Sequence, residues 1–332
     1  MIRVVSLYAS RSPMYDELNR RASAYAADLG LEYAWAPHDG YSDEYAIEQL
    51  KDADAGIIDV DPFDRKIFSQ LGSRCRLLVR YGVGFDAVSL TDATEAGIAI
   101  ARTAGANAES VAEMALALIM AAKRQLILNQ SIVDAGRWDH NVGGELLGKK
   151  VGILGFGAIG RRLACLLGCF DAEIYAHDPN LDEAAIADLG ARQADLETIF
   201  SECDAISVHV PYLPATHHLV DARLLSLMKP DAVIVCTSRG NVVDEDALAE
   251  VLRERRILGA GLDVFAREPL PMESPLRGLD NVVLTPHVSA QTTDALWNIY
   301  RRALEVAADF FAGRELDRAD LLNPECLEKA QS

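Results

Sequence analysis

The sequence lacks any uninterrupted apolar run that approaches the roughly 20 residues of a membrane-spanning helix. It is also poor in basic residues: 32 lysines and arginines stand against 50 aspartates and glutamates, which gives a formal charge of −18 at pH 7. A chain this acidic is a poor partner for nucleic acid or for an anionic membrane surface. We therefore expect neither kind of partner.

Cysteine is scarce as well, and no Cys-x-x-Cys pair is present among the six. Several cysteines fall in apolar stretches, which favours buried, reduced thiols over disulfides or metal ligands. Cys165 and Cys169 stand four residues apart in an apolar helical pattern, so we expect both in the core. His217 and His218 lack the spacing and the carboxylate neighbours of a zinc site, so no metal is expected. The N-terminus shows no signal-peptide pattern, which predicts a cytoplasmic protein.

Half of the 332 residues are apolar, which allows two domains with separate cores. Short apolar segments alternate with helical patterns along the chain, as is typical of α/β domains with parallel sheets. We expect long helices over residues 14–29, 107–128 and 291–311, and a glycine-rich irregular arm over 129–148. The expected strands are 2–8, 55–60, 77–80, 149–154, 172–176, 205–210, 232–236, 258–263 and 282–284.

A glycine motif lies near the middle of the chain, between a buried strand pattern and an amphipathic helix pattern. Gly155, Gly157 and Gly160 have the G-x-G-x-x-G spacing that lets a backbone turn approach a pyrophosphate at a helix N-terminus. Asp178 follows Gly160 by 18 residues, at the end of the next strand. Its carboxylate can accept hydrogen bonds from the ribose hydroxyls and would repel the extra phosphate of NADP. The motif therefore predicts NAD.

The position of this motif also predicts the domain organisation. Because it begins midway along the chain, another unit must precede the cofactor domain. The helix expected over 291–311 follows the last strand of the cofactor domain and can return to that first unit. We therefore expect a substrate domain formed by residues 1–103 and 288–332, and an NAD-binding domain formed by residues 104–287.

Polar residues follow three consecutive strands of the second domain. Arg239, Glu268 and His287 each come shortly after a strand, and the carboxyl ends of parallel strands meet at one edge of a sheet. A guanidinium can bind a carboxylate through two hydrogen bonds and polarise the neighbouring carbonyl. An imidazole can donate a proton to a developing alkoxide, and a nearby carboxylate favours its protonated form. The set predicts reduction of a 2-keto acid, with the nicotinamide supplying the hydride.

Further segments match the pattern of one known family. They are residues 80–86, 107–113, 148–160, 209–211, 238–240, 263–269 and 285–287. Together they resemble the D-isomer-specific 2-hydroxyacid dehydrogenases, which include glyoxylate/hydroxypyruvate reductases and 3-phosphoglycerate dehydrogenases, over nearly the whole chain. The resemblance implies a Rossmann-type doubly wound parallel sheet for NAD and a smaller, flavodoxin-like α/β substrate domain that is discontinuous in sequence.

The resemblance also implies a role for each group of residues. His287 is the expected acid/base, Glu268 its partner, and Arg239 the group that binds and polarises the substrate. The loop with Arg80, Val83 and Gly84 is expected to hold the substrate carboxylate through backbone N–H groups. The residues implied beside the cofactor are Gly155, Gly157, Ala158, Ile159, Gly160, Asp178, Val210, Pro211, Thr237, Ser238 and Asp263.

Some features leave alternatives open. Tyr81, Arg102 and Gln291 depart from the family pattern, so the identity of the 2-hydroxy acid is not predicted. A formate- or phosphite-type dehydrogenase of the same fold remains an alternative, and so does an NAD-sensing interaction protein that resembles the related corepressors. We expect a homodimer formed through the cofactor domain and the arm over 129–148. Trp138 in this arm is expected at the dimer interface or, alternatively, at a neighbouring active site.

Overall fold

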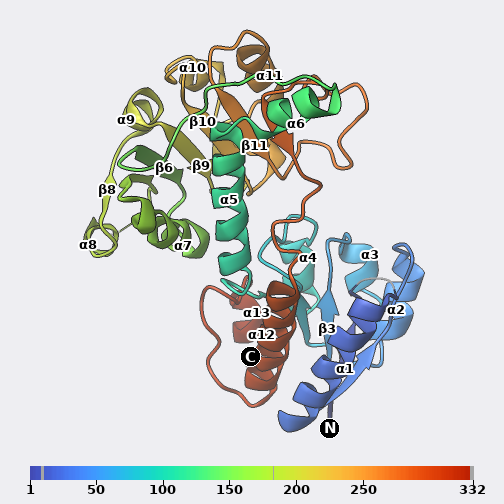
Figure 1. Ribbon diagram of the computed structural model, residues 1–332. Coiled ribbons are helices and arrows are strands. Elements are labelled where there is room, and N and C mark those ends of the chain that lie inside the picture. The colour runs from blue at the N-terminus through green and yellow to red at the C-terminus, as the bar shows by residue number, and fades with distance from the viewer. Residues whose placement is uncertain (9–10, 182, 330–332) are drawn as a thin grey trace. The chain divides into compact units, whose positions relative to one another are not determined.

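The computed structural model describes residues 1–8, 11–181 and 183–329. The chain divides into two compact units, the first formed by Met1–Asn107 and Thr292–Ser332 and the second by Ala108–Gln291. The first unit contains both ends of the chain, which are blue and red in Figure 1. The unit boundaries at 107/108 and 291/292 lie near the domain boundaries expected at 103/104 and 287/288.

The first unit contains a five-stranded parallel sheet in the order β2-β1-β3-β4-β5. This is the strand order of flavodoxin-like sheets, so the expected fold of this unit is confirmed. The strands are β1 (Ile2–Ser6), β2 (Leu31–Trp35), β3 (Ala55–Ile58), β4 (Leu77–Arg80) and β5 (Ala99–Arg102). The helices are α1 (Pro13–Asp28), α2 (Asp43–Leu50), α3 (Arg65–Phe68), α4 (Leu90–Glu95), α12 (Thr293–Phe311) and α13 (Glu325–Lys329).

Helices cover both faces of this sheet, because its strands are apolar on both sides. Val4 and Val79 pack in one cluster with residues of α1 and α12, among them Tyr300. Val5 and Leu78, their neighbours in sequence, pack in the opposite cluster with residues of α2, α3 and α4. The alternation follows from the two-residue period of a strand. Helix α12 thus completes the first unit from the far end of the sequence.

The second unit contains a seven-stranded parallel sheet in the order β12-β11-β10-β9-β6-β7-β8. Counted from β6, six of these strands have the doubly wound order 3-2-1-4-5-6 of Rossmann folds, as expected. The strands are β6 (Lys150–Leu154), β7 (Glu173–His177), β8 (Ala191–Gln193), β9 (Ala205–Val208), β10 (Val233–Cys236), β11 (Gly259–Leu262) and β12 (Val282–Leu284). The strand order reverses between β6 and β9, where such sheets bind their ligands.

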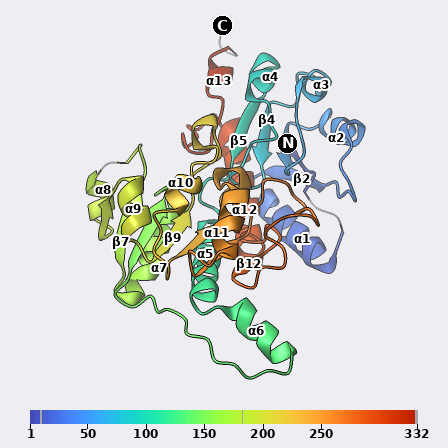
Figure 2. The ribbon, with the colours of Figure 1, turned by 90° about the horizontal axis from the view of Figure 1, so that it is seen from above.

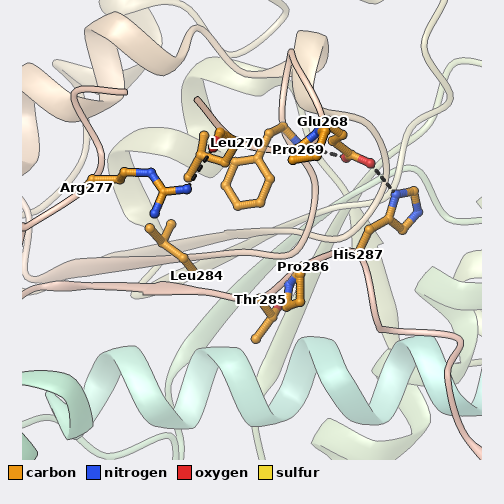
Figure 3. Close-up of a pocket in the computed structure, with 9 residues that line it drawn as sticks. Glu268, Pro269, Leu270, Arg277, Leu284, Thr285, Pro286 and His287 are labelled. Atoms are coloured by element: carbon orange, nitrogen blue, oxygen red, sulfur yellow. Dashed lines mark hydrogen bonds and ion pairs between the residues drawn. The ribbon is translucent and has the colours of Figure 1, made fainter. Parts of the chain in front are cut away.

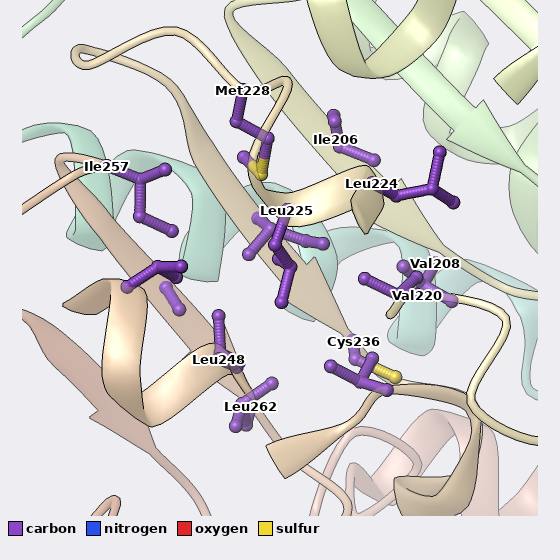
Figure 4. Packing of buried hydrophobic residues seen from close by; sticks show 14 of the residues in the cluster. Ile206, Val208, Val220, Leu224, Leu225, Met228, Cys236, Leu248, Ile257 and Leu262 are labelled. Carbon is purple, nitrogen blue, oxygen red and sulfur yellow. The ribbon is translucent and has the colours of Figure 1, made fainter. Parts of the chain in front are cut away.

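Two apolar clusters enclose this second sheet. One cluster joins Ile206 and Ile234 to residues of α9 (Leu196–Glu202), α10 (Ala222–Leu225) and α11 (Glu245–Arg253), and Figure 4 shows its central part. The other joins Val233 and Val235 to residues of α5 (Ala108–Lys123) and α7 (Ala158–Leu167). Burial on both faces explains why these strands are continuous apolar runs.

Two expectations about helices are wrong. The single helix expected over 107–128 is interrupted: α5 ends at Lys123 and α6 (Leu126–Asp134) begins after Gln125, whose φ of 49° is left-handed. Figure 2 shows α6 and the chain after it extending away from the sheet of this unit. Cys165 and Cys169 are exposed rather than in the core. The buried face of α7 passes through Gly160, Leu163, Ala164 and Leu167, and Cys165 lies on a different face.

Candidate active site

The glycine motif forms a turn between β6 and α7 in which two of the glycines have no room for a side chain. A Cβ on Gly155, whose φ is +87°, would lie 2.7 Å from the backbone nitrogen of Val210. A Cβ on Gly160 would lie 2.3 Å from the carbonyl oxygen of Gly155. A Cβ on Gly157 would meet nothing within 4 Å, so there is open space at the N-terminus of α7, where Ala158 and Ile159 follow. Such a terminus attracts anions.

Asp178 directly follows β7 and lies against this turn. Its Oδ2 accepts a hydrogen bond of 3.0 Å from the backbone N–H of Phe156, and its Oδ1 accepts one of 3.0 Å from that of Asn180. A carboxylate has about four acceptor positions, so two remain for ribose hydroxyls. The remaining acceptor positions of Asp178 and the open helix terminus therefore suit a dinucleotide.

His209 directly follows β9 and is half-buried. Its Nε2 lies 2.8 Å from Oγ of Ser207, and its Nδ1 lies 3.3 Å from Oγ1 of Thr237. Burial lowers the pKa of His209 to about 4, so the imidazole is neutral at pH 7. His209 thus connects the segment after β9, where Val210 and Pro211 follow it, to the segment after β10, which contains Thr237 and Ser238.

Asp263, at the end of β11, organises the loop that carries His287. The side chain is 0% exposed. Its carboxylate accepts hydrogen bonds from Oγ1 of Thr285 (2.6 Å), from the N–H of Val288 (2.9 Å), and from both the N–H (2.8 Å) and the hydroxyl of Ser289. Its backbone carbonyl accepts a further bond, of 2.8 Å, from the N–H of His287. The place of Asp263 beside the cofactor, expected from the family, stays a prediction.

The loop brings His287 to Glu268, which comes from the segment after β11 (Figure 3). Nδ1 of His287 lies 2.8 Å from Oε2 of Glu268, and Oε1 of Glu268 accepts a hydrogen bond of 3.0 Å from the N–H of Phe265. Burial raises the pKa of Glu268, but the bonds from His287 and Phe265 and the charges of His287 and Arg239 outweigh it and leave this pKa below its usual value. The imidazole side chain is 44% exposed.

Arg239 stands at the end of β10, next to a glycine that the fold requires. A Cβ on Gly240 would lie 1.8 Å from the carbonyl carbon of Phe265 and 2.1 Å from the nitrogen of Ala266. The backbone after β10 therefore touches the turn that leads to Glu268. Nη1 of Arg239 donates a hydrogen bond of 2.7 Å to the carbonyl of Ser238, and its charge contributes to the lowered pKa of Glu268. The structure thus brings Arg239, Glu268 and His287 to one edge of the sheet.

A cavity of about 560 Å³ lies beside the His287–Glu268 pair (Figure 3). Its walls are mainly apolar and include Phe265, Leu270 and Leu284. Arg277, which sequence reasoning missed, donates bonds of 2.8 and 2.7 Å to the carbonyls of Pro271 and Leu270 and so holds one wall. No pattern around Arg277 indicated this role, because both of its acceptors are backbone atoms of a loop.

The loop with Arg80, Val83 and Gly84 belongs to the first unit. Gly82 and Thr103 exchange hydrogen bonds. The carbonyl of Gly82 accepts one from the N–H of Thr103, and the N–H of Gly82 donates one of 3.1 Å to Oγ1 of Thr103. Within the described part of the chain, the N–H groups of Val83 and Gly84 donate to no protein acceptor. The side chain of Arg80 is 8% exposed. Its Nη1 lies 3.5 Å from Oδ1 of Asp59 and donates a hydrogen bond to the carbonyl of Tyr81.

Two of the residues that depart from the family pattern have structural roles in this first unit. Tyr81 is buried, and its ring stacks on that of Tyr8 with the ring centroids 3.7 Å apart. Its hydroxyl donates a hydrogen bond of 2.8 Å to the carbonyl of Leu296. Arg102 donates a bond of 2.7 Å to the carbonyl of Ala319 and lies over the ring of Phe85. Both side chains therefore stabilise the unit around the loop of Val83.

Two kinds of site are absent from the residues that the structure describes. No helix there is long and apolar enough to span a membrane. No group of three or more histidine, cysteine, aspartate or glutamate side chains there is arranged to hold a metal ion.

Comparison with known proteins identifies the family. Residues 116–289 match the family model described as D-isomer specific 2-hydroxyacid dehydrogenase, NAD binding domain. The chain is 36% identical over 263 residues to a glyoxylate reductase from Korarchaeum cryptofilum, covering 77% of this chain and 79% of that protein. It is 39% identical over 230 residues to a hydroxypyruvate reductase from Thermotoga maritima, covering 68% and 74%.

A solved structure gives the same result. The D-lactate dehydrogenase from Aquifex aeolicus, complexed with NAD and lactic acid, superposes with a TM-score of 0.79 at 26% identity, covering 96% of this chain and 99% of that chain. The family, the fold and the cofactor predicted from the sequence are thereby confirmed. The chain belongs to the D-isomer-specific 2-hydroxyacid dehydrogenases, NAD-dependent oxidoreductases that act on the CH–OH group of their donors.

Proposed function

We propose that this protein reduces a small 2-keto acid, with His287 as the acid/base, Glu268 as its partner and Arg239 as the substrate-binding cation. The observation that carries the proposal is the 2.8 Å contact between His287 and Glu268, in a loop fixed by the buried Asp263. Because Nδ1 of His287 faces Glu268, Nε2 is the nitrogen that can reach a substrate.

The proposed chemistry assigns one task to each side chain. The guanidinium of Arg239 binds the substrate carboxylate and polarises the adjacent carbonyl. NADH, when bound, supplies the hydride that reduces the carbonyl carbon. The imidazolium of His287 gives the proton on Nε2 to the carbonyl oxygen, which becomes the hydroxyl of the product. Glu268 stabilises the imidazolium before the transfer, and solvent returns the proton afterwards.

We also propose which residues hold the cofactor and the substrate. The open N-terminus of α7 at Gly157 suits the pyrophosphate, and Asp178 suits the ribose hydroxyls of NAD in preference to the phosphate of NADP. The unit formed by Ala108–Gln291 is then the NAD-binding domain and the other unit the substrate domain. The available N–H groups of Val83 and Gly84 suit the substrate carboxylate.

For the substrate we propose glyoxylate or hydroxypyruvate, and not a phosphorylated keto acid. Relatives named glyoxylate reductase and hydroxypyruvate reductase support this choice. The charges near the Val83 loop support it too: β3 pairs with β4 so that Ile58 lies opposite Arg80, and Asp59 already binds the guanidinium. Asp61 follows two residues later and interacts electrostatically with Asp59, so a doubly charged phosphate would gain little from a cation that is already paired.

The test is NADH oxidation with a panel of 2-keto acids, repeated with NADPH. We expect turnover of glyoxylate and hydroxypyruvate, a lower kcat/KM for phosphohydroxypyruvate, and a preference for NADH. Reduction of NAD by formate or phosphite, without keto acid turnover, would instead favour that type of dehydrogenase. Tight NAD binding without any turnover would favour a sensor protein and reject the proposed function.

We propose that the protein is a cytoplasmic homodimer, formed through the NAD-binding unit and the arm over 129–148. The arm carries large exposed apolar side chains: Trp138 is 82% and Val142 90% exposed. Such side chains usually gain stability by burial in an interface. Light scattering after size exclusion should show a dimer, and the double variant Trp138→Ala/Val142→Asp should be monomeric. A wild-type monomer at micromolar concentration would reject the dimer.

A further inference from the structure

The first residue of α11 reaches the turn that precedes Glu268. Oε1 of Glu245 accepts a hydrogen bond of 2.5 Å from the backbone N–H of Ala266. The preceding N–H, that of Phe265, donates to Oε1 of Glu268. Two successive peptide N–H groups therefore bind two different carboxylates, one from α11 and one from the pair with His287.

The Phe265–Ala266 turn is held on its other side by Gly240. Because the backbone atoms of both turn residues lie within 2.3 Å of where a Cβ of Gly240 would be, the turn touches the glycine backbone directly. The turn can therefore be displaced only away from Gly240, and Glu245 provides a bond that opposes a displacement of Ala266.

Helix α11 is a firm support for this bond. Its N-cap Asp244 accepts a bond of 3.0 Å from the N–H of Ala247, which fixes the first turn. Leu248 and Leu252, later in the helix, are fully buried in the apolar cluster of Figure 4. The backbone of Glu245 is thus tied to the core of the unit, while its side chain extends to the turn.

Glu245 also lies in an acidic environment. Burial raises the pKa of Glu245, the bond from Ala266 opposes this, and the charges of Asp246 and Glu268 raise the pKa further while that of His218 lowers it. Asp244, which lies 3.8 Å from His218, is the remaining acidic group at this helix end. Arg239 and His287 both act electrostatically on Glu268.

We propose that Glu245 is a positioning residue for the reaction: it holds the Phe265–Ala266 turn in place, and through this turn it keeps Glu268 aligned with His287. The inference rests on the proposed function of the His287–Glu268 pair. The proposed role depends on the length of the Glu245 side chain, which places an acceptor oxygen at the N–H of Ala266, and not on its charge.

Three variants separate the effect of the length of the Glu245 side chain from that of its charge. Glu245→Gln keeps a carbonyl oxygen at the same reach and loses the charge. Glu245→Asp keeps the charge but is one methylene too short, and Glu245→Ala loses both. Asp246→Ala is the matched control, because it removes a carboxylate from the same turn of α11 without any bond to the Phe265–Ala266 turn.

We expect Glu245→Ala and Glu245→Asp to lower kcat for keto acid reduction by about tenfold, the upper range for a lost hydrogen bond of ordinary strength. KM for NADH should stay within about twofold, because the cofactor turn is unaffected. Glu245→Gln should retain kcat within about threefold of wild type, as should Asp246→Ala. The inference would be overturned if Glu245→Gln and Glu245→Ala lowered kcat equally. It would also be overturned if Glu245→Ala and Glu245→Asp both retained the kcat of wild type.

Amide hydrogen exchange gives a readout that does not need turnover. The N–H groups of Phe265 and Ala266 should be protected in wild type and in Glu245→Gln, and lose protection at least tenfold in Glu245→Asp. If these amides respond as expected and wild type reduces no keto acid, the proposed function fails while the positioning of the turn stands. If wild type turns over and protection is the same in all variants, the inference fails while the proposed function stands.

Discussion

Nδ1 of His287 and Oε2 of Glu268 lie 2.8 Å apart, although the two residues come from different loops. The loop of His287 is fixed by the buried carboxylate of Asp263, and that of Glu268 by the N–H of Phe265. The left-handed φ of 53° at His287 is part of this arrangement. A pair that is held by both of its loops is suited to present one imidazole nitrogen to a substrate in a constant direction.

Replacing His287 by alanine should lower kcat for keto acid reduction at least about a hundredfold, the lower range for the loss of an acid/base. The substitution leaves the glycine turn and Asp178 unchanged, so the dissociation constant of NADH should stay within about threefold. Steady-state assays and fluorescence titration measure the two quantities. Unchanged turnover would show that another group supplies the proton.

Replacing Glu268 by glutamine should change the pH profile. Hydrogen bonds and neighbouring charges hold the pKa of Glu268 below its usual value, so this carboxylate is ionised through neutral pH and is neutralised only in acid. Its charge favours the protonated imidazole that reduction needs. We therefore expect the alkaline decline of kcat/KM for reduction to move to lower pH in Glu268→Gln. A move to higher pH would contradict the pairing.

The architecture, and the positions of three polar residues at one edge of the second sheet, were largely predictable because each has a local signature. The glycine spacing with Asp178 predicts the cofactor turn, and Arg239, Glu268 and His287 each follow a buried strand. The parallel sheet then brings these ends together by a general rule of topology. The catalytic roles of these three residues, and the roles of the cofactor and substrate residues, remain predictions.

Other features depend on contacts that sequence patterns do not contain. The break between α5 and α6 was missed because the apolar pattern continues through it. Helix α5 ends at Lys123, whose carbonyl accepts a hydrogen bond of 2.9 Å from the N–H of Gly144 in the later part of the arm. The pairing of Arg80 with Asp59 was missed for a similar reason, since it depends on the register of β3 and β4.

Replacing Gly240 by alanine should disrupt the site, because the added Cβ would lie 1.8 Å from the backbone of Phe265. Backbone atoms cannot yield as a flexible side chain can, so the turn before Glu268 must shift. We expect kcat to fall at least about a hundredfold, or the melting temperature to fall by several degrees. Gly168→Ala is the control, since a Cβ there would meet nothing within 4 Å. Wild-type stability and kcat in Gly240→Ala would contradict the packing.

The half-buried imidazole of His209 should make stability depend on pH. Its pKa in the folded state is about 4, against about 6.5 in an unfolded chain, so only the unfolded state binds a proton between these values. Above pH 6.5 the group contributes no pH dependence, and as the pH falls below 6.5 the folded state loses stability. Between pH 7.5 and 5.0 this amounts to about 2 kcal/mol in the free energy of unfolding.

The contribution of His209 can be separated from that of the carboxyl groups by urea unfolding at pH 7.5 and at pH 5.0. The proteins to compare are wild type, His209→Gln and His140→Gln. Glutamine can bond to Ser207 and Thr237 but does not titrate, so His209→Gln should lose less stability on acidification than wild type by about that amount. His140 is exposed, and its replacement should leave the pH dependence unchanged. Equal losses in wild type and His209→Gln would mean that His209 is protonated in the folded protein, in contradiction to its burial between β9 and β10.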